Sequence, residues 1–71
     1  MIFNERIRLL RTEHDLTQAQ VAAEAGITLR AYQRMEADSK PHYDTLLKLA
    51  DFYAVSTDWL MGRTERRERL L

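Results

Sequence analysis

The chain has 71 residues, no cysteine, and eleven basic residues balanced by eleven acidic ones. This length supports one domain with a small core, and the lack of cysteine excludes disulfides and thiolate zinc sites. With only two glycines and one proline, the composition favours an all-α fold stabilised by helix packing. No apolar run approaches about 18 residues and no signal-peptide core is present at the start, so a cytoplasmic location is expected.

The charge balance argues against a simple nucleic-acid assignment. The isoelectric point of about 6.7 falls below the strongly basic profile of many DNA-binding domains. The distribution is uneven, because three basic residues outnumber two acidic ones between residues 26 and 43, and arginines dominate from residue 63 onward. This weak segregation is compatible with DNA binding and predicts modest non-specific affinity.

A first helix is predicted from about Asn4, as its N-cap, to His14. Phe3, Ile7 and Leu10 recur at i, i+4 and i+7, which is the spacing of one buried helix face. Leu16 lies in the following connection and is expected to be buried.

A second helix begins after Thr17, whose side chain is a good N-cap. Gln20 stands three positions later and completes a capping box. Apolar residues then recur at helical spacing, at Val21, Ala22 and Ala25. Gly26 follows where a helix stops with positive φ, Ile27 returns to the core, and Thr28 can cap a third helix. Two helices joined in this way form a helix-turn-helix unit.

The third predicted helix, from about Thr28 to Glu36, has two distinct sides. The side expected to face the core carries Thr28, Ala31, Tyr32 and Met35. The opposite side carries Leu29, Arg30, Gln33 and Arg34. Arginine reads guanine O6 and N7, glutamine suits adenine N6 and N7, and an exposed leucine suits a thymine methyl group. An ordinary solvated face is an equally good interpretation of this helix alone, since arginine and glutamine are good helix formers.

Two further helices are predicted after Pro41. The fourth has Asp44 near its start, and its apolar face comprises Leu46, Leu49, Ala50 and Tyr53. Ser56 caps a short fifth helix over residues 57–61, closed by Gly62. Trp59 is interpreted as a core residue, with a partner surface as the alternative. The charged residues from 63 to 71 are expected to form a tail or a helical extension.

Together these residues resemble the Xre-like, phage-repressor type of helix-turn-helix domain, the family of Cro and the cI repressors. The resemblance covers almost the whole chain. The residues that carry it are, in chain order, Arg6-Ile7-Arg8, Leu10-Arg11, Leu16-Thr17-Gln18, Val21-Ala22, Gly26-Ile27-Thr28, Tyr32, Met35-Glu36, Pro41, Thr45-Leu46, Lys48-Leu49-Ala50, Val55-Ser56, Asp58, Leu60 and Gly62. It implies a five-helix DNA-binding domain over residues 1–62, with residues 63–71 outside it.

The resemblance also implies roles for individual residues. The positions that reach base edges are Leu29, Arg30, Gln33 and Arg34. The positions near DNA phosphates are Thr17, Gln18, Thr28, Lys40 and Arg11. Gln18 also matches a glutamine that braces the reading helix. Arg11 and Glu36 match an ion pair between the first and third helices, which is the favoured role for Arg11. The expected function is a sequence-specific transcriptional regulator, with repression as its mode, acting as a homodimer on a two-fold DNA operator.

Some features depart from the family or leave an alternative open. Asp38 lies in the loop that usually approaches phosphate and would repel it, Met35 replaces an aromatic residue, and His42 stands where a better cap is expected. The two histidines are isolated and no phosphate-binding glycine loop exists, so no enzyme, cofactor or metal site is predicted. The alternative functions are a protein-interaction module and the antitoxin of a two-protein pair.

Overall fold

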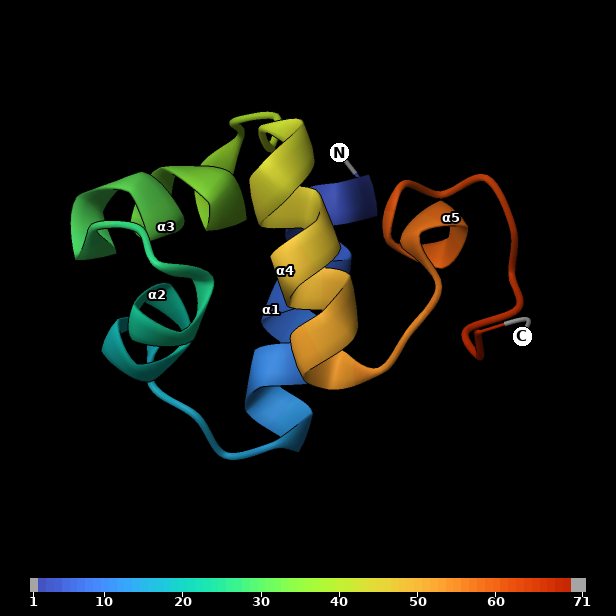
Figure 1. Ribbon diagram of the computed structural model, residues 1–71, viewed down its shortest axis with the longest axis horizontal. Helices are drawn as coiled ribbons and strands as arrows, with labels where there is room; N and C mark the ends of the chain where they lie inside the picture. Colours follow the sequence, from blue (N-terminus) through green and yellow to red (C-terminus); the bar gives the residue numbers. More distant parts are fainter. Residues whose placement is uncertain (1, 70–71) are drawn as a thin grey trace.

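A computed structural model describes residues 2–69, which form helices and no strand. The helices are α1 (Ile2–Glu13), α2 (Gln18–Ala25), α3 (Leu29–Ala37), α4 (Tyr43–Tyr53) and α5 (Thr57–Leu60). In Figure 1, α4 crosses in front of α1, with α2 and α3 on one side and α5 and the C-terminal segment on the other. The all-α, five-helix prediction is confirmed. None of the helices in residues 2–69 has the length and apolar character needed to cross a membrane.

All five helices contribute side chains to one hydrophobic core. Its most completely buried large side chains are Tyr32, Phe3, Ile7, Leu10, Leu49, Leu60 and Val21. Trp59 is also buried, as its interpretation as a core residue predicts. Leu16, expected to be buried, is only partly covered and packs against the edge of this core together with Ile27 and Leu46.

Local capping rules position the helix-turn-helix unit. The Thr17 hydroxyl accepts a hydrogen bond from the Gln20 backbone N–H at 3.1 Å, and the Gln20 side chain accepts one from Thr17 N–H at 2.8 Å. Gly26 ends α2 with a φ of 69°, a conformation that costs a residue with a Cβ about 1–2 kcal/mol. Thr28 then caps α3 by accepting from Ala31 N–H. The turn therefore sets the direction in which α3 leaves α2.

Asn4 is not the N-cap of the first helix, and this prediction is wrong. α1 begins at Ile2, and Asn4 lies in its first turn with 3% of its surface exposed. Its Nδ2 donates to the backbone carbonyls of Met35 and of Ser39, the latter at 3.0 Å. The Asn4 amide nitrogen thus satisfies one carbonyl in the last turn of α3 and one in the loop that follows it, which holds the start of α1 against the end of α3.

The described part of the C-terminal segment, residues 63–69, is not helical, so the helical extension is not formed there. It folds back along the protein, with an antiparallel bridge between Val55 and Glu68. Arg67 pairs with Glu13 of α1, and the guanidinium groups of Arg6 and Arg67 lie 4.5 and 5.1 Å from the centre of the Trp59 ring. Arginines of this segment contact acidic side chains and the face of an aromatic ring. They do not form the pairs along one helix that the spacing of the charges suggested. Residues 70 and 71 of the predicted tail, like residue 1, lie outside the described part.

Candidate nucleic-acid interface

The four side chains predicted to face outward on α3 are exposed. Leu29 has 43% of its surface accessible, and Arg30, Gln33 and Arg34 are also in the exposed class. On the opposite side of the same helix, Tyr32 is fully buried. The helix therefore presents a continuous ridge of long polar side chains next to one apolar side chain, and we call Leu29, Arg30, Gln33 and Arg34 the α3 ridge.

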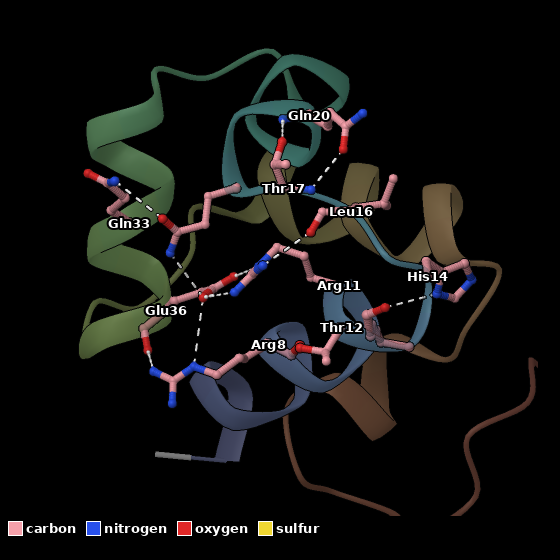
Figure 2. Close-up of polar contacts among 11 residues, drawn as sticks. Arg8, Arg11, Thr12, His14, Leu16, Thr17, Gln20, Gln33 and Glu36 are labelled. Carbon is pink, nitrogen blue, oxygen red and sulfur yellow. Dashed lines mark hydrogen bonds and ion pairs between the residues drawn. The ribbon is translucent and has the colours of Figure 1, made fainter.

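A buried carboxylate holds α3 against the first two helices. Glu36 has 3% of its surface exposed. Its two oxygens accept from Arg11 Nε at 2.6 Å and Arg11 Nη2 at 3.1 Å, and Gln18 Nε2 donates to it at 3.2 Å. Arg8 lies at the rim, with its Nε 3.7 Å from the same carboxylate. Figure 2 shows these groups converging on Glu36 from α1 and α2.

The electrostatics of this cluster keep both partners charged. Burial raises the pKa of the Glu36 carboxyl, but the hydrogen bonds and charge of Arg11, with further contributions from Tyr32 and Gln18, outweigh burial and hold that pKa below its ordinary value of 4.5. The same carboxylate raises the pKa of Arg11. Because the pair is charged and well bonded, the position of α3 relative to α1 is fixed by strong, directional contacts.

A second amide extends the cluster onto the α3 ridge. Gln33 Nε2 donates to Gln18 Oε1 at 3.2 Å, so Gln18 bonds to Glu36 through its nitrogen and to Gln33 through its oxygen (Figure 2). The resemblance predicted that Gln18 braces the reading helix, but it did not name Gln33 as a partner. Residues 18 and 33 lie on different helices, and no local spacing rule relates them.

The candidate phosphate-contacting groups occupy different positions around the ridge. The hydroxyls of Thr17 and Thr28 accept from helix N–H groups at the starts of α2 and α3, which leaves each hydroxyl hydrogen available as a donor. Lys40 is exposed in the loop between α3 and α4. Arg11 differs, because its guanidinium already donates to Glu36 and to the carbonyl of Leu16 at 3.1 Å.

A hollow of about 260 Å³ lies between α3 and α4, beside the α3 ridge. Apolar, polar and basic side chains line this hollow. They are Ile27, Ala31, Arg34, Met35, Ser39, Lys40, His42 and Thr45. His42 precedes α4 without a side-chain capping bond, as its poor match to the expected cap indicated. Arg34 and Lys40 thus bring positive charge from two elements to one edge of the ridge. Asp38, which ends α3, is exposed in the same loop.

The amino-acid sequence of the helix-turn-helix unit matches that of a known protein family. The sequence profile of the helix-turn-helix family matches residues 7–60. The chain belongs to this family, and the resemblance drawn from its residues is confirmed.

Several curated relatives are similar along most of the chain. The HTH-type transcriptional regulator YobD of Bacillus subtilis is 42% identical over 65 residues, which cover 90% of this chain and 58% of YobD. The cryptic phage CTXphi transcriptional repressor RstR of Vibrio cholerae is 36% identical, over 100% of this chain and 66% of RstR. The regulator ImmR of Bacillus subtilis is 36% identical, over 92% of this chain and 52% of ImmR. The chain thus spans between half and two thirds of the length of these relatives. No solved structure matches it.

Proposed function

We propose that this protein is a sequence-specific, double-stranded DNA-binding transcriptional regulator that acts as a repressor. The observation that carries the proposal is the α3 ridge, whose side chains are exposed while the helix beneath them is held by the buried Glu36. Relatives named as transcriptional regulators, and RstR as a repressor, support it.

In this proposal α3 enters the major groove. Arg30 and Arg34 donate to guanine O6 and N7, and Leu29 packs against a thymine methyl group. Gln33 reads the edge of a further base. The ion pair between Arg11 and Glu36 keeps the helix in one orientation, so these contacts form without reordering the protein.

Phosphate contacts at both sides of the groove set the register of α3. We propose that the hydroxyls of Thr17 and Thr28 and the remaining N–H of Gln18 donate to backbone phosphates near the starts of α2 and α3, where helix N–H groups favour anions. Lys40 contacts phosphate from the other edge. For Arg11 we propose a structural role, because most of its contacts are made inside the protein.

The proposed assembly on DNA is a homodimer in the cytoplasm. Two copies would place two α3 ridges about one helical turn apart on a two-fold operator, and the paired contacts would strengthen binding.

Selection from a random duplex library tests the proposal. The purified protein is mixed with the library, bound duplexes are amplified over several rounds, and the enriched sequences are aligned. We expect a motif of two inverted half-sites. A library that remains random after selection would contradict DNA reading and favour a protein-interaction module.

A further inference from the structure

The basic side chains divide into those that are paired with acids and those that are not. The paired ones lie on α1 and in residues 63–69, and they are Arg6, Arg8, Arg11, Arg63, Arg67 and Arg69. No ion pair among residues 2–69 includes Arg30, Arg34 or Lys40. A chain without net charge thus keeps unpaired positive charge on α3 and in the loop that follows it.

The hollow between α3 and α4 adds a titratable group to this unpaired charge. Arg34 from α3, Lys40 from the loop and His42 from the start of α4 line it together, and all three are exposed. His42 makes no side-chain capping bond and, within the described part of the chain, no ion pair. Asp38 and Asp44 are also exposed, but neither lines the hollow. The charged neighbours of His42 in the hollow are therefore both cations.

The remaining groups of the hollow also suit an anion. Ser39 and Thr45 line it and carry hydroxyl groups that can donate hydrogen bonds. The first N–H groups of α4 receive no side-chain acceptor from His42, and the start of a helix favours negative charge. Because the hollow lies beside the α3 ridge, a phosphate of the DNA strand meets it when α3 occupies the major groove.

We propose that His42 couples operator binding to proton uptake, because its protonated ring donates to the DNA phosphate held in this hollow. The inference rests on the proposed function and deepens it, since it adds a condition, the pH, that regulates affinity. A protonated imidazole brings a further positive charge and a charge-assisted hydrogen bond to the phosphate, whereas a neutral ring brings no charge. The protonated form binds the phosphate more strongly, so affinity for the operator rises as the pH falls from 8 to 6.

The other histidine provides an internal control. Histidines are the side chains that ordinarily change charge between pH 5 and 8, and the chain has two. His14 Nδ1 lies 2.9 Å from the Leu10 carbonyl oxygen, and its ring centre lies 5.2 Å from that of Tyr53. Tyr53 ends α4, whereas His42 precedes its first residue. The two histidines thus lie at opposite ends of α4, and His14 is remote from the hollow.

The experiment measures the affinity of the full chain for the selected operator by fluorescence anisotropy. Titrations are made at pH 6, 7 and 8 and at several salt concentrations, with the parent, His42→Asn, His42→Lys and His14→Asn. Asparagine is a favoured N-cap that does not titrate, so His42→Asn removes the proton site without disfavouring α4. Lysine keeps a positive charge throughout this pH range, so His42→Lys imitates the protonated state.

For the parent we expect the dissociation constant to be about threefold to fivefold lower at pH 6 than at pH 8 for each bound copy, and about tenfold or more lower for two copies. The slope of log affinity against log salt should be steeper at pH 6, by up to about 0.9 for each copy. His42→Asn should change less than about twofold between these pH values. His42→Lys should bind equally well at both, with the steeper salt slope, and His14→Asn should behave as the parent does.

The outcomes separate this inference from the proposed function. A parent protein that enriches no operator overturns both. A parent that binds its operator with the same affinity at pH 6 and pH 8 overturns the inference alone. The same holds if the pH dependence persists in His42→Asn or disappears in His14→Asn. A salt slope that does not change with pH in the parent also overturns it, because the proton is then not taken up at a phosphate contact.

Discussion

Arg11 and Glu36 lie 25 positions apart and form a two-pronged ion pair, with nitrogen–oxygen distances of 2.6 and 3.1 Å, that joins α1 to α3. Removing only the arginine leaves a buried carboxylate without its main partner. We expect Arg11→Met to lower the free energy of unfolding by about 3 kcal/mol. Urea denaturation followed by circular dichroism measures this.

The double variant Arg11→Met/Glu36→Met is the informative control for that ion pair. It removes both charges, so we expect it to be more stable than Arg11→Met alone. If the double variant is less stable than Arg11→Met, the cost of the single substitution does not come from leaving the Glu36 carboxylate buried without a partner.

The stability of the fold should depend on the ionisation of Glu36. Its pKa in the folded protein is lower than the ordinary value of 4.5 that applies to the unfolded chain. The stabilisation is therefore complete above that ordinary value and is lost as the pH falls through the lowered pKa. Urea denaturation between pH 7 and pH 3 should show a steeper loss for the parent than for Glu36→Gln. Glu24→Gln, which changes an exposed carboxylate on α2, should follow the parent. Equal slopes for the parent and Glu36→Gln would refute this account.

Two helix ends provide a matched test of backbone strain. Gly26 and Ala54 both have positive φ, 69° and 55°, at the ends of α2 and α4. Gly26→Ala should lower stability by about 1 kcal/mol, whereas Ala54→Gly should raise it by about 0.5 kcal/mol, because only glycine adopts this conformation without a steric penalty. Thermal denaturation of the two variants should move the melting temperature in opposite directions. A shift of both in the same direction would contradict the prediction.

Lys40 should contribute to DNA affinity through charge alone. Lys40→Ala is expected to weaken binding to every duplex and to reduce the slope of log affinity against log salt by about 0.9, the effect of one phosphate contact. Arg66→Ala is the control, because the C-terminal segment and α3 lie on opposite sides of α1 and α4 (Figure 1). An unchanged slope for Lys40→Ala would remove it from the phosphate contacts.

Local rules were sufficient to predict the helix-turn-helix unit. Thr17, Gly26 and Thr28 act through neighbours at most a few positions away, so their capping roles could be predicted from spacing. The exposed side of α3 followed from the helical period, since its apolar positions recur on the other side.

Most of the features that were missed depend on contacts between distant segments. Asn4 has the residue type of a cap, but its partners are carbonyls more than 30 positions away. Ala54 adopts a conformation usually given to glycine, so composition provides no signal for it. The packing of Arg67 against Trp59 and the hydrogen bond between Gln33 and Gln18 likewise join residues whose separation follows no periodic pattern.

The most direct test of the central claim is the affinity of Arg30→Ala and Arg34→Ala for the selected operator, measured by fluorescence anisotropy at one fixed salt concentration. Each variant should lose about 1–3 kcal/mol of binding free energy and relax the preference at one base pair, while Arg66→Ala keeps the parental affinity. If both variants bind the operator with the parental affinity and base preference, the α3 ridge does not read DNA.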